Sequence, residues 1–242
     1  MESVLARELK LAFPPMAIIF TDDKPDGAVM FVEDRWACVV SMLKVVARGK
    51  TAAFDRKRYG CSGGGTGLCL GDFYKDRRGE IEYFLSTGND ETEGEAYFKT
   101  PEIARRFLEE LPPEDIPFEY VVFKQLAQVD LAKETPELVV MLANPDQLSA
   151  LVVLANYDSP VRDNVVAPFG AGCHSICLLP YRESKRANPR AVIGMFDISA
   201  RPHVDADVLS FTVPFRSFKA MEANVPGSFL ERSAWGRVKA RL

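Results

Sequence analysis

The order of apolar and polar positions predicts a series of short strands. Runs of about four to eight apolar residues bounded by turn residues are typical of strands buried in a sheet. Met16–Phe20 is the clearest, because five apolar residues end there at three polar ones. The strands predicted in this way are Met16–Phe20, Thr51–Phe54, Tyr120–Leu126, Leu138–Ala143, Ala191–Phe196 and Phe211–Pro214.

Between these runs, apolar residues recur at the spacing of amphipathic helices. From Trp36 to Arg48 they repeat every three to four positions, and Gly49 is a natural C-terminal stop. Proline at the first turn marks two further helices, which begin at Pro101 and Pro145. The predicted helices are residues 1–12, 36–48, 101–111, 145–156, 204–210, 215–223 and 229–238, with Pro14-Pro15 and Pro112-Pro113 ending the first and third.

Strands alternating with helices predict an α/β fold with a mixed β-sheet flanked by helices. Residues 72–100 are polar and rich in Gly and Glu, and we expect loop and edge strand there. No linker interrupts the pattern, so residues 1–242 are expected to form a single domain. Cys38 and Cys173 each begin an apolar stretch that leads to a strand, which is compatible with two pseudo-related halves meeting at a shared seam.

The composition excludes several classes of protein. The chain is 47% hydrophobic and 26% charged, with a net charge of −4, as in ordinary globular proteins. The densest basic patch, Arg56-Lys57-Arg58, is too short to favour nucleic-acid binding. No membrane span and no signal-peptide core is found. An odd number of cysteines, five, argues against a secreted disulfide scaffold and favours a cytoplasmic location with reduced thiols.

The most informative segment is the run from Gly60 to Gly71, which holds six of the sixteen glycines and two of the five cysteines. Glycine lets a backbone approach a ligand closely. The run lacks the spacing of a phosphate-binding loop or a dinucleotide-binding turn. The backbone N–H groups of Gly63 and Gly64 could still bind a phosphate or carboxylate. A tight turn is the alternative.

Three cysteines are candidate ligands. Cys38 and Cys173 lie near predicted helix N-termini, where the helix dipole favours a thiolate, and Cys61 begins the glycine run. Three thiolates from three loops form a ligand set for an iron–sulfur cluster or a soft metal. The alternative is that buried cysteines act as small hydrophobes, which we expect for Cys69 and Cys177.

Two catalytic patterns are present, a serine nucleophile elbow that lacks its context and thiol catalysis, which stays a third alternative. Residues 60–64 match the Gly-x-Ser-x-Gly of a nucleophile elbow, but the charged residues before them cannot form the buried strand it needs. Thiol catalysis would use Cys61 or Cys173 with His174 as base. Neighbouring residues on a helix diverge by about 100°, so His174 should not activate Cys173 directly.

Arg201 is the strongest polar candidate outside the cysteines. It follows the strand that ends at Phe196-Asp197, and ligands of α/β proteins bind at the carboxyl ends of strands. We expect Arg201 to orient an anionic ligand. The two histidines, His174 and His203, could bind metal or move a proton, with a structural role as the alternative.

Several motifs together resemble one family. They are Pro15-Met16-Ala17-Ile18, Cys38 with residues 45–50, Cys61-Ser62-Gly63-Gly64, Pro136-Glu137-Leu138-Val139-Val140, Asn144-Pro145-Asp146-Gln147, Gly172-Cys173, and Phe196-Asp197 with Arg201, Asp205 and Pro214. This set resembles the DUF169 (ArCR) family of uncharacterised prokaryotic proteins. The chain departs from it at Phe196, where the family has Gly, and at Asp205-Ala206-Asp207, where it has Asp-Glu. The resemblance implies a single α/β domain and a site around Cys38, Cys61, Cys173 and Arg201, without an established activity.

The leading interpretation is a cytoplasmic, redox-related cofactor-binding protein. Cys38, Cys61 and Cys173 would hold an iron–sulfur cluster or soft metal, and the Gly63 and Gly64 backbone would reach the cluster or a substrate. The alternative is a metal-free module that binds an anion, phosphate or carboxylate with the glycine run and Arg201. Partners would be a small-molecule ligand or a redox partner, with no nucleic acid and no membrane. The oligomeric state stays open, a homo-oligomer included.

Overall fold

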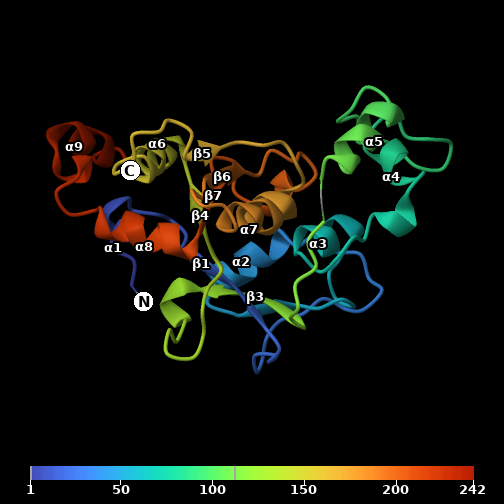
Figure 1. Ribbon diagram of the computed structural model, residues 1–242, viewed down its shortest axis with the longest axis horizontal. Helices are drawn as coiled ribbons and strands as arrows, with labels where there is room; N and C mark the ends of the chain where they lie inside the picture. Colours follow the sequence, from blue (N-terminus) through green and yellow to red (C-terminus); the bar gives the residue numbers. More distant parts are fainter. Residues whose placement is uncertain (1, 112) are drawn as a thin grey trace.

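The computed structural model describes residues 2–111 and 113–242, which form a seven-stranded sheet with helices on both faces (Figure 1). The strand order is β2-β3-β1-β4-β7-β6-β5. The β5–β6 pair is parallel and the other pairs are antiparallel, so the predicted mixed α/β fold is confirmed. The strands are β1 (Met16–Thr21), β2 (Ala52–Phe54), β3 (Tyr120–Gln125), β4 (Leu138–Ala143), β5 (Val165–Val166), β6 (Ala191–Gly194) and β7 (Leu209–Pro214).

The helices divide between the two faces of the sheet. One face packs against α1, α6, α8 and α9, and the other against α2, a π-helical turn at His174–Leu178 and α7. No helix in the described ranges has the length and apolar content to span a membrane. The helices are α1 (Val4–Glu8), α2 (Ser41–Ala47), α3 (Ser62–Gly67), α4 (Ile81–Phe84), α5 (Pro101–Glu109), α6 (Pro145–Ala155), α7 (Leu179–Ser184), α8 (Phe215–Ala223) and α9 (Ser233–Lys239).

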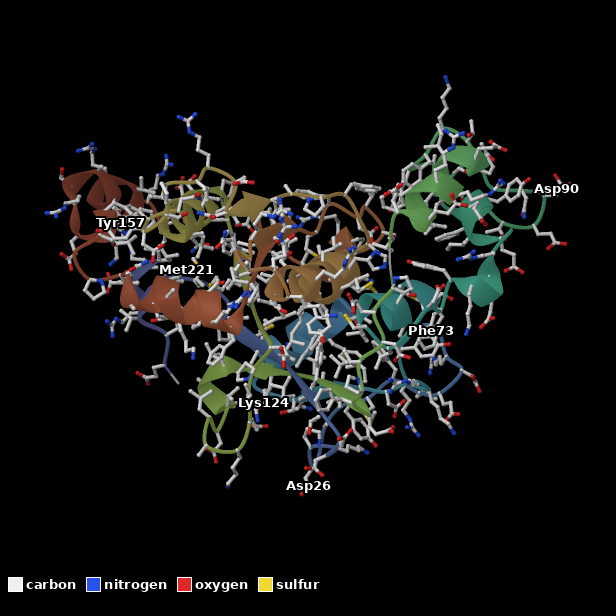
Figure 2. The ribbon with its side chains drawn as sticks, in the orientation of Figure 1. Asp26, Phe73, Asp90, Lys124, Tyr157 and Met221 are labelled. Carbon is white, nitrogen blue, oxygen red and sulfur yellow. The ribbon has the colours of Figure 1, made fainter. Side chains whose placement is uncertain are left out.

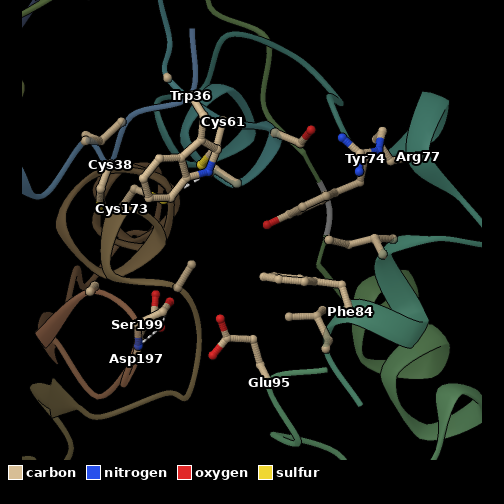
Figure 3. A pocket seen from close by; sticks show the side chains of 18 of the residues that line it. Trp36, Cys38, Cys61, Tyr74, Arg77, Phe84, Glu95, Cys173, Asp197 and Ser199 are labelled. Carbon is tan, nitrogen blue, oxygen red and sulfur yellow. Dashed lines mark hydrogen bonds between the residues drawn. The ribbon is translucent and has the colours of Figure 1, made fainter. Parts of the chain in front are cut away.

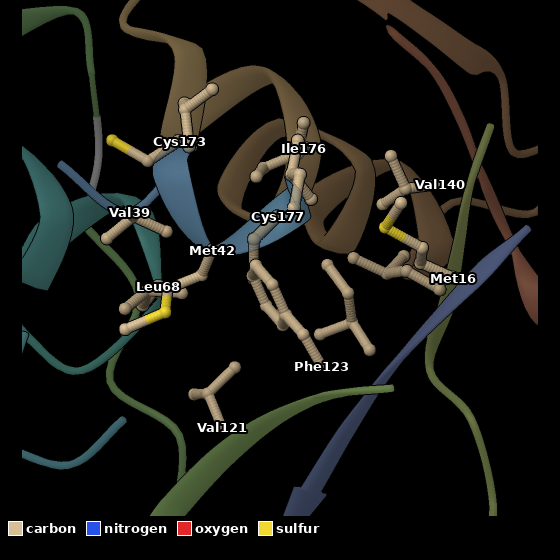
Figure 4. Packing of buried hydrophobic residues seen from close by; sticks show 14 of the residues in the cluster. Met16, Val39, Met42, Leu68, Val121, Phe123, Val140, Cys173, Ile176 and Cys177 are labelled. Atoms are coloured by element: carbon tan, nitrogen blue, oxygen red, sulfur yellow. The ribbon is translucent and has the colours of Figure 1, made fainter. Parts of the chain in front are cut away.

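Strand β1 shows how the sequence builds two cores. Side chains alternate across a strand, so Met16 and Ile18 enter one hydrophobic cluster while Ala17 and Ile19 enter the other. Figure 4 shows the first cluster, in which Met16 and side chains of β3 and β4 lie against α2 and the π-helical turn. A central strand with both faces buried therefore needs the continuous apolar run seen in the sequence.

Residues 75–111, here called the arm, stand apart from the sheet and contain α4 and α5 (Figure 1). The arm leaves the body through a short two-stranded neck, where Leu70 bridges Asp115 and the Gly71 N–H donates to the Glu114 carbonyl at 3.0 Å. Figure 2 shows Asp90 at its outer end and Phe73 beside the body. The edge strand expected within residues 72–100 is not formed there; short helical segments and loops take its place.

One other predicted element is wrong, and one begins later than predicted. Residues 204–210 do not form a helix, because Leu209 pairs with Ala143 at the start of β7. The helix expected from Trp36 begins only at Ser41, whose N–H and hydroxyl both bond the Cys38 carbonyl. Met1 and Pro112, assigned to a helix and to a helix stop, lie outside the described residues.

Candidate functional site

A cavity of about 930 Å³ lies between the body and the arm (Figure 3). Its walls come from the segments before α2 and α3, from the start of the π-helical turn, from the loop after β6 and from the inner side of the arm. These segments are far apart in sequence, so the cavity exists only in the folded chain.

The three candidate cysteines all line this cavity. Cys38 precedes α2, Cys61 is the N-cap of α3, and Cys173 is the N-cap of the π-helical turn. The other two cysteines, Cys69 and Cys177, are fully buried in the core, as predicted. The structure thus separates a cavity set of thiols from a core set.

The glycine run forms helix α3, which corrects the expectation of an open loop. A Cβ on Gly64 would stand 2.3 Å from the Tyr59 carbonyl oxygen, and one on Gly67 would stand 2.7 Å from the Cys173 sulfur. Glycine is poor in helices, but here it permits α3 to pack directly on the backbone before it and on the π-helical turn. This close approach brings Cys61 and Cys173 to the same wall.

Both sulfurs are hydrogen-bonded to the α3 backbone. The Cys61 Sγ accepts the Gly64 N–H at 3.3 Å, and the Cys173 thiol donates to the Gly63 carbonyl at 3.0 Å. Gly63 and Gly64 were predicted to reach a ligand with their N–H groups; in the structure the Gly63 carbonyl and the Gly64 N–H bond the two thiols. The Gly65 N–H bonds the Cys61 carbonyl within the helix and does not point to a ligand.

Burial keeps the cavity thiols protonated. It raises the pKa of Cys38 and Cys61 and raises that of Cys173 well above its usual value. Backbone N–H groups act in the opposite direction at all three sulfurs, those of Val40 and Ser41 at Cys38 and that of Gly64 at Cys61. Charge on Cys61 raises the pKa of Cys38, and charge on Cys38 and Cys61 raises that of Cys173, so the three thiols interact across the cavity.

Tyr74, which is half-buried, and His174, which is buried, form a pair beside the thiols. The Tyr74 hydroxyl lies 3.2 Å from the His174 Nε2, and in Figure 3 it points into the cavity. Burial lowers the pKa of His174 to about 4, so the imidazole is neutral at pH 7. No local sequence pattern indicates Tyr74, which lies in a segment expected to be loop.

Asp197 joins the body to the arm. It is 8% exposed and accepts hydrogen bonds from the Tyr97 hydroxyl at 3.0 Å, the Ser199 hydroxyl at 2.8 Å and the Gly172 N–H at 3.1 Å. Burial raises the pKa of Tyr97 to about 12, so its hydroxyl stays a donor. Next to this contact, Phe98 and Phe107 of the arm pack on Phe169 of the body.

Arg201 is placed elsewhere. Its guanidinium donates to the carbonyls of Val208 at 2.6 Å, Ala206 at 2.8 Å and Asp205 at 3.1 Å, and it is not among the residues that line the cavity. These bonds hold the turn before β7. The anion-orienting role expected of Arg201 would require it to leave three carbonyls.

Comparison with protein families matches residues 4–224 to DUF169, described as uncharacterised ArCR. The chain belongs to the DUF169 family. No curated protein and no solved structure matches it. The DUF169 match covers all seven strands and the segments that line the cavity, and it ends before α9.

The DUF169 cavity offers soft donors for a metal, but not in a ready arrangement. Across the described chain, no three His, Cys, Asp or Glu side chains are grouped to hold a metal ion. Cys61 and Cys173 direct their sulfurs at the α3 backbone instead. Coordination by the three thiols would therefore require the side chains of Cys61 and Cys173 to rotate away from these bonds. The loss of each bond would cost about 1 kcal/mol.

Proposed function

We propose that the protein binds a redox-related cofactor, an iron–sulfur cluster or a soft metal ion, through Cys38, Cys61 and Cys173. The observation that carries this proposal is that three thiols from three separate segments line one cavity, each with a backbone N–H near its sulfur. N–H donors to sulfur stabilise thiolates and tune the potential of clusters.

A bound cation would reverse the protonation of the thiols. Without one, burial favours the neutral form; a thiophilic metal deprotonates its cysteine ligands outright. Three cysteines leave one position of a tetrahedral metal or of a four-iron cluster for a non-protein ligand. The remaining space of the cavity would accept a small molecule beside that position, and a redox partner would exchange electrons. We infer a reducing, cytoplasmic setting, because it keeps all five thiols free.

The test is metal and sulfide analysis of protein purified without oxygen. We expect iron with acid-labile sulfide, or one soft metal ion, at close to one site per chain. Cys38→Ser, Cys61→Ser and Cys173→Ser should each reduce that content several-fold, because the site has no spare thiol. Cys177→Ala is the matched control, since this thiol is buried in the core away from the cavity. A folded protein without metal, or equal loss in the control, would contradict the proposal.

A second candidate is a metal-free module that binds a small molecule. It is favoured by the size of the cavity and by the absence of a ready metal-ligand group in the described residues. Arg201 could serve an anionic ligand only after release from its carbonyls, whereas the Tyr74 hydroxyl and the exposed Arg35 already line the cavity as donors. Thermal-shift measurements with phosphate, carboxylates and nucleotides test this candidate. If Cys61→Ser removes a metal and leaves ligand affinity unchanged, the two roles are separate.

A further inference from the structure

The charges around the cavity are unevenly distributed. Among the described residues, six carboxylates and four cationic side chains line it. All four cations are exposed, and three of them are already paired with carboxylates. These four are Arg35, Arg56, Lys57 and Arg77. Positive charge is therefore confined to the exposed residues of the lining, where solvent screens it.

The inner carboxylates have no such compensation. Asp197 is buried and bonded to neutral donors, and Glu95 is half-buried on the arm. Neither has a cationic partner within the described residues. Figure 3 shows the Glu95 carboxylate pointing from the arm across the cavity toward Asp197 and Ser199. Two carboxylates that lack a cationic partner and lie at one space favour a cation near them.

Apart from the four exposed cations, no described side chain of the lining brings a fixed positive charge to that space. His174 is buried, and its Nε2 lies 3.2 Å from the Tyr74 hydroxyl. The thiols are neutral or, with a metal bound, anionic: three thiolates around a divalent cation retain a negative charge. The preference for a cation therefore holds whether or not a metal is present.

Aromatic surface lies beside the carboxylates. Trp36 is 74% exposed and Phe84 is 38% exposed, and both line the cavity. Large aromatic side chains left exposed at a cavity mark a surface for a ligand. Their faces also attract a positive charge, by about 0.5–2 kcal/mol.

We propose that the cavity binds an organic cation, a protonated amine carried on a flat apolar body. The ammonium group lies between Glu95 and Asp197, and the apolar body lies against Phe84 and Trp36. This proposal deepens the proposed function, because it names the class of small molecule that binds in the same cavity. It holds with or without a bound metal.

Three compounds that share the indole ring system but differ in charge test the assignment. They are the cation tryptamine, the neutral alcohol tryptophol and the anion indole-3-acetate. Their affinities are measured by calorimetry at about 0.15 M salt, where unspecific surface attraction is screened. We expect tryptamine to bind at least about tenfold more tightly than tryptophol, and indole-3-acetate to bind least. Glu95→Gln should weaken tryptamine about tenfold and leave tryptophol unchanged. Glu93→Gln is the matched control, an exposed arm carboxylate outside the cavity lining.

Indole-3-acetate binding as tightly as tryptamine, no binding by any of the three, or equal effects of the Glu95 and Glu93 variants would each overturn the assignment. Metal content is measured in the same preparation. Metal-free protein that selects tryptamine would remove the metal proposal alone. Metal-loaded protein that is indifferent to ligand charge would remove the amine proposal alone.

Discussion

At the scale of single residues, the site depends on groups whose environment is set by close packing. The Gly64 backbone touches the Tyr59 carbonyl, and the His174 ring is buried against α3. Both residues stand out in the sequence, but only their packing in the fold gives each a specific energetic consequence. Those consequences can be measured separately.

Gly64→Ala should destabilise the protein. Its Cβ would stand 2.3 Å from a backbone oxygen that cannot move without shifting the chain before Cys61. We expect the free energy of unfolding to fall by about 1–3 kcal/mol, measured by urea denaturation. Gly236→Ala in α9 is the control: nothing lies within 4 Å of its Cβ, so this variant should be neutral or slightly more stable. Equal stability of both variants would contradict the close contact.

His174 should make the protein less stable in mild acid. Folding lowers its pKa from 6.5 to about 4, so the unfolded chain binds the proton more readily. The contribution of the neutral imidazole is fully present above about pH 6.5 and is lost as the pH falls toward 4. At pH 5 the loss is about 2 kcal/mol.

The measurement is the free energy of unfolding at about pH 7.5 and pH 5, for the native chain and for His174→Gln. The variant should lose about 2 kcal/mol less between the two conditions. His203→Gln is the control, because His203 lies outside the cavity lining. This variant should lose as much free energy of unfolding between the two pH values as the native chain. An unchanged pH dependence in His174→Gln would show that other groups cause it.

At the scale of elements, the arm is attached to the body by the neck and, across the cavity, by Tyr97. The Tyr97 hydroxyl donates to Asp197 and accepts the Ser199 N–H at 2.8 Å. Together with the contact of Phe98 and Phe107 on Phe169, these bonds close one side of the cavity. The arm is therefore held by few contacts, as mobile elements are.

Tyr97→Phe should loosen the arm without unfolding the sheet. Losing the two bonds should raise hydrogen exchange in α4 and α5 about tenfold, while exchange in β1 and β4 stays unchanged. Tyr83→Phe is the matched control, since its exposed hydroxyl has no hydrogen-bond partner in the described chain. Unchanged exchange in the arm, or equal changes in the sheet, would contradict this attachment.

The sequence predicted best those elements whose pattern is complete within a few residues. Strand β4 and helix α8 lie at the predicted residues, because continuous burial and helical spacing are both visible locally. Helix α3 was missed, since four glycines in six residues disfavour a helix unless tertiary packing requires it. The first two residues of β7, Leu209 and Ser210, were missed because their pairing with β4 decides their conformation.

The cavity was predicted only in part. Cys38, Cys61 and Cys173 were singled out by residue type and by their places near glycines and helix starts, and the fold brings them to one cavity. Tyr74, Glu95 and Tyr97 were missed. Glu95 and Tyr97 reach the cavity only because the arm folds across it. The contacts of Tyr74 with His174 and of Tyr97 with Asp197 each join residues 100 positions apart, so they leave no local pattern in one sequence.

At the scale of the whole molecule, the two ends of the chain stabilise each other. Helix α1 lies beside α8 (Figure 1), and the Glu222 carboxylate of α8 accepts from the Ser3 hydroxyl and from the Val4 N–H at 3.0 Å. The carboxylate thus caps the free N–H groups of α1. Lys239 of α9 adds an ion pair with Glu8 at 2.8 Å.

Glu222→Gln should reduce the stability of the entire domain. Loss of the charge at the α1 N-terminus should lower the free energy of unfolding by about 1–2 kcal/mol. Glu109→Gln, an exposed carboxylate on the arm, is the control and should change it by less than about 0.5 kcal/mol. Thermal unfolding followed by circular dichroism distinguishes the two. A Glu222 variant as stable as the control would mean that the contact between the two ends of the chain does not contribute to the free energy of unfolding.

The double attachment of the arm also has a kinetic consequence. A compound that reaches the cavity past Tyr97 can enter only while the Asp197 bonds are open, so its observed binding rate should level off at high concentration at the opening frequency of the arm. A compound that enters by another side of the cavity should show no such plateau. The presence or absence of the plateau would then show which side of the cavity is the entrance in solution.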